Sequence, residues 1–332
     1  MPKTRLWAFV AAFVALSVRA GSLYGQSCGS TITKSTTLHA NLGPCSGDGL
    51  FIGASNIILN LNGFSITGPG TPMGVIGVWV LAGNTGVKIN GPGIITGFDQ
   101  GILLDGLTDG SRVTQVQLLG NFFNGIEVGS NTNTIINNTV SSSACYGIKV
   151  GNNNNQLTGN AIRGATDVLG SGTCATENEP PAGGTGIWIV VALGTVVRNN
   201  TVNASSNGLF TDGFSSGTTI ANNDFSGNTQ DGLTSQGQAT MTSNQANGNG
   251  RDGISIAQGS GSVIQSNTAN SNGRRGIGLG DLLGAAAGSN NSITSNRTLG
   301  NVTDLFWDGA GTGNCWKNNI FDTSSGALPV CP

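Results

Sequence analysis

A glycine followed by an aliphatic residue recurs along this chain at nearly constant intervals. Each copy opens a short phrase of alternating aliphatic residues, as in Gly125-Ile126-Glu127-Val128. Most copies lie 21 to 24 residues apart, and they begin at Gly101, Gly125, Gly147, Gly186, Gly208, Gly232, Gly253 and Gly276. A repeat of this length indicates a solenoid, in which each coil buries its apolar face against the next.

A second apolar position, followed three residues later by an asparagine, precedes most of these glycines. The seven copies are Ile135 with Asn138, Leu157 with Asn160, Val197 with Asn200, Ile220 with Asn223, Met241 with Asn244, Ile264 with Asn267, and Ile293 with Asn296. An inward asparagine at the same corner of every coil can bond the backbone and the amides of neighbouring coils. It satisfies polar groups that burial would otherwise strand. The spacing therefore predicts an asparagine ladder.

The residues between these positions distinguish two kinds of solenoid. Leucine-rich repeats need regularly spaced leucines and often a helical segment, whereas these coils are rich in Gly, Asn, Ser and Thr. The alternation in residues 125–128 predicts a short strand, and its copies predict parallel stacking about 4.8 Å apart. Since parallel crossovers are nearly always right-handed, we expect an all-β fold: a single right-handed parallel β-helix of roughly ten coils.

These repeats, together with the opening phrase from Asn56 to Gly68, resemble the right-handed parallel β-helix repeat family. This is the pectate-lyase-like group, which includes carbohydrate-binding proteins, sugar hydrolases, lyases and epimerases. The resemblance covers roughly residues 56–319. It implies the fold specifically and the function only broadly, because one solenoid carries many chemistries.

The amino-terminal residues have the pattern of a secretory signal peptide, predicted here over residues 1–20. Lys3 and Arg5 precede an apolar run that ends at Val18, and Val18-Arg19-Ala20 supplies a small-residue cleavage site. The run is shorter than the roughly 20 residues of a membrane span, so no membrane span is expected. A secreted, periplasmic or cell-surface location follows.

The rest of the chain is expected to form one domain. We assign an amino-terminal cap to residues 21–55, the β-helix to residues 56–321 with an outward insertion at 163–185, and a carboxy-terminal tail to residues 322–332. Charged residues make up 9% of the sequence and the net charge is -2, so no basic patch for nucleic acid is predicted. The expected partner is a polysaccharide or cell-surface glycan, and a monomer is expected.

Six cysteines in an exported chain indicate three disulfides, although the sequence alone permits several connectivities. Proximity along the chain favours local pairing: Cys28 with Cys45, Cys145 with Cys174, and Cys315 with Cys331. The first and last pairs would tie the two end caps, and the middle pair would hold the insertion. No metal site is expected, because no Cys-x-x-Cys pair occurs and His39 is the only histidine.

The third residue of each Gly-aliphatic phrase should point to solvent if the aliphatic residues point inward. In chain order this outward row is Trp79, Leu103, Glu127, Lys149, Trp188, Phe210, Thr234, Ser255 and Gly278. Asp105 and Asp212 lie two residues further along their strands. Aromatic rings stack on sugar rings, and charges bond hydroxyls or uronate carboxylates. The predicted substrate-binding residues are therefore Trp79, Asp105, Glu127, Lys149, Trp188, Phe210 and Asp212.

A plainer interpretation of the same row has equal weight. Glu127 and Lys149 can be a cross-strand ion pair on a solvated face, and Trp188 and Phe210 can lie under the insertion at 163–185. Aromatic side chains in adjacent coils that nothing covered would form an exposed apolar patch.

The resemblance also bears on catalysis. Polygalacturonase-like members use clustered aspartates with Gly-His-Gly and Arg-Ile-Lys phrases, which this sequence lacks. Lyases and epimerases of the fold abstract a proton beside a uronate carboxylate, often with a cation such as calcium. The best matching set is Lys149 and Tyr146, with Glu127 and Asp105 as cation ligands. Whether the protein is an enzyme stays open, and calcium is expected only for a lyase.

A further group of charged residues lies just before two of the glycines. Arg251, Arg274 and Arg275 accompany Asp231 and Asp252, and we interpret them as turn residues in surface ion pairs.

Three functions therefore remain for the structure to test. The first is a secreted carbohydrate-binding or polysaccharide-modifying protein. The second is a non-catalytic structural or adhesive cell-surface protein. The third is a periplasmic accessory protein of the same repeat family, similar to those used in metal-centre maturation.

Overall fold

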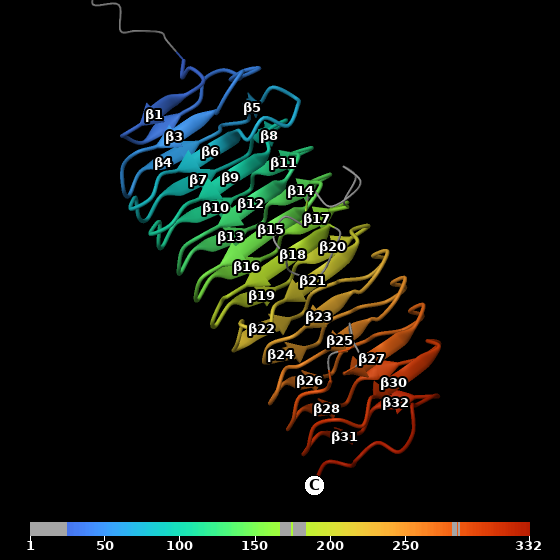
Figure 1. Cartoon of the computed structure of the whole chain (residues 1–332). Helices are drawn as coiled ribbons and strands as arrows, with labels where there is room; N and C mark the ends of the chain where they lie inside the picture. Colours follow the sequence, from blue (N-terminus) through green and yellow to red (C-terminus); the bar gives the residue numbers. More distant parts are fainter. Residues whose placement is uncertain (1–24, 167–173, 175–183, 281–283, 285) are drawn as a thin grey trace, which may run out of the picture.

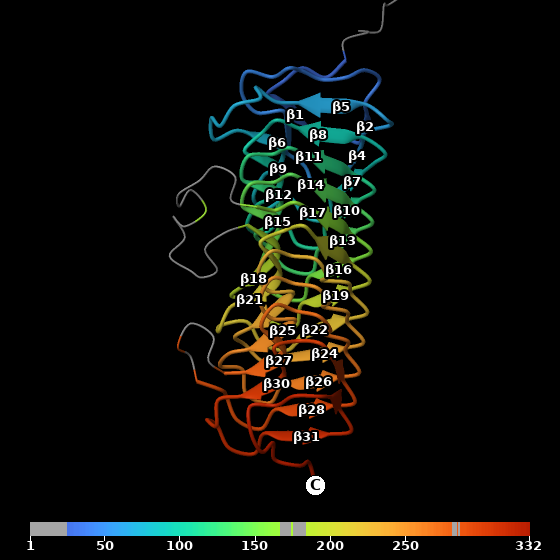
Figure 2. The ribbon, with the colours of Figure 1, turned by 90° about the vertical axis from the view of Figure 1, so that its right-hand side faces the viewer.

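The chain forms an elongated column of stacked coils (Figures 1 and 2). The computed structural model describes residues 25–166, 174, 184–280, 284 and 286–332. Each coil contributes one strand to each of two long parallel sheets, and many coils also contribute to a third. Successive copies of a strand pair directly and in parallel, as Ile126 pairs with Ile148 and Ile135 with Leu157. The architecture is a parallel β-helix, as the sequence predicts.

Sheet A contains the strands that carry the Gly-aliphatic phrases. Its twelve strands are β1 (Ser30–Ile32), β3 (Leu50–Ile52), β6 (Ile76–Val80), β9 (Gln100–Leu104), β12 (Asn124–Val128), β15 (Tyr146–Gly151), β18 (Thr185–Val190), β21 (Asn207–Thr211), β23 (Leu233–Ser235), β25 (Ile254–Ile256), β27 (Arg275–Leu279) and β30 (Thr303–Trp307).

Sheet B also has twelve strands and carries the second apolar position of each coil. They are β2 (Thr36–Thr37), β4 (Ile58–Asn60), β7 (Lys88–Asn90), β10 (Arg112–Thr114), β13 (Thr134–Ile136), β16 (Gln156–Thr158), β19 (Val196–Arg198), β22 (Thr218–Ala221), β24 (Ala239–Thr242), β26 (Val263–Gln265), β28 (Ser292–Thr294) and β31 (Cys315–Lys317).

Sheet C is shorter and follows sheet B in each coil. Its six strands are β5 (Ser65–Thr67), β8 (Ile94–Thr96), β11 (Gln117–Leu119), β14 (Thr139–Ser141), β17 (Ala161–Arg163) and β20 (Thr201–Asn203). Single parallel bridges through Asp224, Gln245 and Thr268 continue the same line to Arg297. There β29 (Arg297–Thr298) pairs with β32 (Ile320–Phe321).

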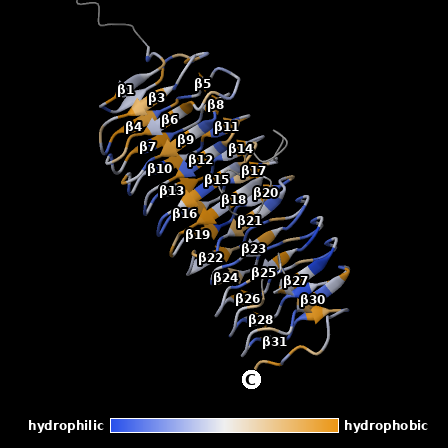
Figure 3. Cartoon of the chain, in the orientation of Figure 1, coloured by the Kyte–Doolittle hydropathy of each residue, from blue (hydrophilic) through white to orange (hydrophobic). Residues whose placement is uncertain are grey.

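The core runs the length of the column between the sheets. In most strands the middle residue is buried and its neighbours are more exposed, as with Ile89 in β7 and Val113 in β10. Figure 3 shows hydrophobic residues along the strands and hydrophilic residues at many corners. Gly125 shows why each phrase opens with glycine: a Cβ there would lie 2.6 Å from the carbonyl oxygen of Gly147 and would also clash with Val140. The next coil leaves no room for a side chain.

The seven predicted asparagines point inward at the corner between sheets B and C. Asn138 Nδ2, for example, donates to Asn160 Oδ1 at 3.0 Å and to the carbonyl of Val113 at 3.1 Å. Asn319 extends the row by one coil. The continuous asparagine ladder comprises Asn138, Asn160, Asn200, Asn223, Asn244, Asn267, Asn296 and Asn319.

A second ladder lies just before sheet A in the carboxy-terminal coils. Its members are Asn228, Asn249, Asn272 and Asn301, which bond one another from coil to coil. The sequence analysis missed it. The signal was present, because the first three members stand four residues before a repeat glycine.

The coil count is twelve, and the expectation of roughly ten was low. The segment from residue 25 to 55, expected to be a cap alone, already contains β1 and β3, which belong to sheet A. β1 lacks the Gly-aliphatic phrase, whereas β3 carries it as Gly49-Leu50-Phe51-Ile52, a copy that the sequence-based prediction overlooked. At the other end, Val330 bridges to Trp316 and closes the last coil.

All three predicted disulfides are present. Cys28 bonds Cys45 near the amino-terminal end, Cys315 bonds Cys331 near the carboxy-terminal end, and Cys145 bonds Cys174. β17 ends at Arg163 and β18 begins at Thr185. Residues 167–173 and 175–183 of the predicted insertion lie outside the described residues, so the insertion stays a prediction. The predicted signal peptide also lies outside them. Within the described residues, no helix has the length and apolar character needed to cross a membrane.

Candidate functional site

The outward row of sheet A has the predicted register. Trp79 pairs with Leu103, Leu103 with Glu127, and Glu127 with Lys149. The row continues through Trp188, Phe210, Thr234, Ser255 and Gly278. Phe51 and Phe306 extend it at the two ends. Neighbouring members are about 4.8 Å apart along the column axis, so the row can follow an extended ligand.

The row divides into an accessible and a buried half. Phe51, Trp79 and Leu103 are partly exposed, and so are Glu127 and Lys149. From Trp188 to Gly278, by contrast, every member is buried.

Trp79 is held in place at the accessible end. Its Nε1 donates to Asp105 Oδ2 at 3.1 Å, and its ring lies 5.7 Å from that of Phe51. Asp105 is itself fixed, because its Oδ1 accepts from the backbone of Gly106 at 2.7 Å. A ring that is fixed before a ligand arrives loses little conformational freedom on binding.

Glu127 and Lys149 form the charged centre of the row. Lys149 Nζ lies 3.4 Å from Glu127 Oε1, and the side chains are 12% and 21% exposed, respectively. Asn124 Nδ2 donates to the other oxygen, Glu127 Oε2, at 2.9 Å. Lys149 also lies 5.1 Å from the ring centre of Trp188, a cation–π contact. An ammonium held in this way is suited to binding a polar or anionic group.

A shallow groove borders the accessible half at the start of the sheet A strands. It is lined by Gly74, Ile76, Asp99, Gln100 and Phe123. Gln100 Oε1 is buried and has no hydrogen-bond partner among the described residues, and the same holds for Oδ1 of the adjacent Asn124. Unpaired buried acceptors of this kind are satisfied by solvent or by a ligand that carries hydroxyl groups.

Trp188 and Phe210 are not open stacking platforms, which corrects the first expectation. They are 1% and 2% exposed and form a separate apolar cluster with Tyr146 and the Cys145–Cys174 disulfide. The rings of Tyr146 and Trp188 lie 4.5 Å apart. The plainer interpretation, in which these two side chains are covered, is therefore correct.

Two further predicted site residues, Tyr146 and Asp212, are buried and bonded within the fold. Tyr146 is 2% exposed and its hydroxyl donates to the carbonyl of Cys174 at 3.4 Å, so it does not face the open surface. Asp212 is fully buried and its carboxylate accepts from the backbone of Val191 and from Ser215. We therefore remove both from the candidate site, together with Trp188 and Phe210.

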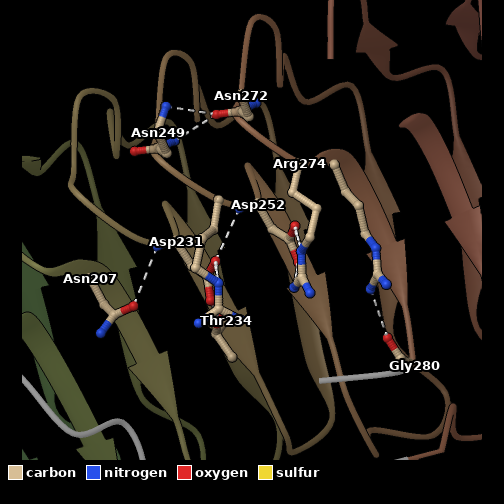
Figure 4. Close-up of polar contacts among 10 residues, drawn as sticks. Asn207, Asp231, Thr234, Asn249, Asp252, Asn272, Arg274 and Gly280 are labelled. Atoms are coloured by element: carbon tan, nitrogen blue, oxygen red, sulfur yellow. Dashed lines mark hydrogen bonds and ion pairs between the residues drawn. The ribbon is translucent and has the colours of Figure 1, made fainter. Parts of the chain in front are cut away.

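The charged residues assigned to surface ion pairs form a more deeply buried cluster (Figure 4). Asp252 is fully buried and accepts two hydrogen bonds from Arg274, at 2.7 Å from Nε and 2.6 Å from Nη2. Asp231, 4% exposed, lies one coil away beside Arg251, whose Nε is 3.6 Å from its Oδ1. The side chains of Arg251 and Arg274 are more than a third exposed, so these two arginines match the earlier interpretation. Arg275 does not, because it is only 6% exposed and its guanidinium lies 3.4 Å from the ring centre of Phe306.

The two carboxylates of this cluster have different surroundings. Burial raises the pKa of Asp231 above its usual value of 3.8, and the neighbouring Asp252 carboxylate raises it further. The backbone N–H of Asp252, which donates to Asp231 Oδ1 at 3.0 Å, and the arginines oppose this only in part. Arg274 binds the Asp252 carboxylate through two nitrogens, whereas Asp231 has no such bidentate partner.

The coils and their parallel sheets define a parallel β-helix protein. A family model described as "Periplasmic copper-binding protein (NosD)" matches residues 28–235, more than half of the chain. The chain belongs to this family. A second model, "Right handed beta helix region", matches residues 185–328. No curated protein matches the sequence.

Two solved structures with similar coils and TM-scores above 0.5 confirm the fold alone, because sequence identity is low. PfbA, a surface adhesin of Streptococcus pneumoniae, is 12% identical, with 82% of this chain and 84% of that one covered and a TM-score of 0.57. The periplasmic alginate epimerase AlgG is 13% identical, with 81% and 78% covered and a TM-score of 0.53. The Dettilon tailspike protein (gp208) is 13% identical with a TM-score of 0.46; 83% of this chain matches only 55% of its length.

The residues that the structure describes do not fit a copper site. Soft thiolate, thioether or imidazole ligands suit copper. All six cysteines are in disulfides and His39 is the only histidine. Among the described residues no three His, Cys, Asp or Glu side chains come together as a metal-binding group.

Proposed function

We propose that this is an exported polysaccharide-binding β-helix protein, and that the sugar chain lies along the accessible half of the outward row. The proposed contact residues are Trp79, Leu103, Glu127 and Lys149, with Asp105 positioning the Trp79 ring. The partly exposed, hydrogen-bonded ring of Trp79 is the observation that carries the proposal. Rings of this kind stack on the apolar faces of sugars.

The rest of the surface supports the same ligand class. The Glu127–Lys149 pair offers both an acceptor and a donor for hydroxyl groups. The groove beside it is lined by Gln100, whose Oε1 has no partner among the described residues and can accept from a sugar hydroxyl. Apolar contact with a few convergent polar groups is typical of a carbohydrate site.

The test is binding of the mature protein to a panel of neutral and acidic polysaccharides. Trp79→Ala should weaken binding at least tenfold without unfolding the coils, because the ring is partly exposed. Phe214→Ala is the control, since Phe214 is 70% exposed and lies away from this half of the row. A folded Trp79→Ala variant that binds as tightly as the parent would exclude this surface.

A substitution on the same surface can distinguish a binding protein from an enzyme. If the protein is a lyase or epimerase, Lys149→Met should abolish turnover of an acidic polysaccharide. Methionine keeps an apolar stem beside Trp188 and removes only the ammonium. If the protein is only a binder, the same variant should weaken binding of acidic chains more than that of neutral chains, because neutral chains lose a hydrogen bond and acidic chains also lose the charge. Measuring kinetics and affinity on one variant separates the two outcomes.

The family match favours a second candidate, a periplasmic accessory protein. In that case the column would serve as a rigid scaffold for a protein partner and would not itself hold copper. Equilibrium dialysis of the purified protein with copper tests this view, and stoichiometric copper binding would contradict it.

A further inference from the structure

Two basic side chains lie side by side on sheet B, on a different strand face from the proposed sugar surface. Lys88 opens β7 and Arg112 opens β10, and the two residues are direct cross-strand partners. Their Cα atoms are therefore about 4.8 Å apart. Both side chains are exposed, and the buried residues next to them, Ile89 and Val113, fix which way they point.

Neither cation has a counter-ion among the residues that the structure describes. In the part of the chain that the structure describes, Lys88 and Arg112 form no ion pair and no side-chain hydrogen bond. Like charges directly opposite each other across a parallel pair repel, which disfavours the folded state slightly. An anion bound between the two would remove that repulsion.

The two cations line a groove of about 400 Å³, within the size range of ligand sites. The third residues of the same strands form its second row: Asn60 pairs with Asn90, and Asn90 with Thr114. Gly91 and Gln115 complete the lining. One row is purely cationic and the other carries amides and a hydroxyl, which both donate and accept.

We propose that this sheet B groove, comprising Asn60, Lys88, Asn90, Gly91, Arg112, Thr114 and Gln115, binds an acidic polysaccharide. The uronate carboxylates lie on Lys88 and Arg112, and the sugar hydroxyls lie on the amide and hydroxyl row. Asn60 Oδ1 already accepts from the backbone of Asn62, so the available acceptors are those of Asn90 and Gln115. A sulfate cannot donate to them and a hydrogen phosphate has at most two O–H groups, whereas a sugar presents several hydroxyls. The two-row arrangement therefore favours a sugar that carries both a carboxylate and hydroxyls.

The experiment separates this groove from the sheet A surface by working in a Trp79→Ala background. The probe is a hexamer of galacturonic acid, with a neutral glucose hexamer and inorganic phosphate as comparisons. Binding is measured by isothermal titration calorimetry at low and at moderate salt. The Trp79→Ala protein should still bind the acidic hexamer, and this binding should weaken at higher salt. The same protein should bind the neutral hexamer at least tenfold less tightly than the acidic one.

Adding Lys88→Gln and Arg112→Gln to that background should reduce affinity for the acidic hexamer at least tenfold. Arg198→Gln is the matched control, because Arg198 is an exposed arginine on the same sheet, in β19. It should leave affinity unchanged. Without ligand at low salt, the Lys88→Gln, Arg112→Gln protein should melt no lower than its background, which shows that it is folded.

Three results would overturn the inference. They are loss of all acidic-hexamer binding in Trp79→Ala alone, undiminished binding after both glutamine substitutions, and phosphate binding as tight as that of the hexamer. The first of these would leave the proposed sheet A function intact, so the two proposals fail separately.

Discussion

The side-chain amide of Asn223 donates to Oδ1 of Asn244 at 2.9 Å, in the next coil. The same nitrogen donates to the carbonyl of Val197 at 3.0 Å, in the preceding coil. Asn223 Oδ1 accepts from the backbone and the side chain of Asn200. One buried amide thus joins three coils, and its loss would leave partners unsatisfied on both sides.

We therefore expect Asn223→Leu to destabilise the protein strongly. Each stranded buried group costs about 1 to 3 kcal/mol of unfolding free energy. Urea unfolding measures the difference. Thr240→Leu is the control, since Thr240 is exposed on the neighbouring strand β24 and should change stability by only about 0.5 kcal/mol. Equal losses of unfolding free energy in the two variants would show that the ladder bonds of Asn223 do not stabilise the protein.

Trp188→Ala should act on stability, because Trp188 is 1% exposed and packs against Tyr146. Truncation of a buried tryptophan leaves a cavity and costs about 3 to 5 kcal/mol. Thermal unfolding of this variant should begin well below that of the parent. If the protein stayed as stable as the parent and lost only glycan binding, Trp188 would belong to the ligand surface after all.

Asp231→Asn should remove a pH dependence of stability. The pKa of Asp231 is raised in the folded protein, so the folded state favours the neutral carboxyl. Its stabilising contribution is present below pH 3.8 and is lost as the pH rises through the raised pKa. Asparagine stays neutral, and the exposed Arg251 loses only a weak partner.

The measurement is urea unfolding of both proteins from acid to neutral pH. Parent and variant should converge at the acid end, and the variant should be as stable as or more stable than the parent at pH 7. Parallel curves across the whole range would contradict the assignment.

Reduction of the disulfides should loosen the ends of the column before its middle. Cys28–Cys45 and Cys315–Cys331 lie in the first and last coils, which have a neighbouring coil on only one side. Hydrogen exchange after reduction should therefore rise first in β1 and β31 and last in β16. Uniform exchange along the column would indicate that the coils unfold as a single unit.

Much of the fold could be predicted because the same residue pattern recurs in most coils. The glycine of each phrase, the inward aliphatic residues and the ladder asparagines each depend on contacts with the adjacent coil, which has the same pattern. Pairing of Glu127 with Lys149, and of Lys149 with Trp188, followed directly from the period. β1, which lacks the phrase, escaped notice, and so did β3, whose phrase Gly49-Leu50-Phe51-Ile52 lies 28 residues before the next copy at Gly77.

The sequence could not predict which side chains of the outward row are exposed and which are buried. Trp79 and Trp188 occupy the same position of their phrases, yet one is partly exposed and the other buried. The repeat specifies only which way a side chain points. What covers it comes from outside the repeat: the cluster around Trp188 includes Cys174, in the insertion, which the disulfide to Cys145 holds against the coil. A local period dictates direction and register, whereas burial on the outer face depends on where chain distant in sequence comes to lie.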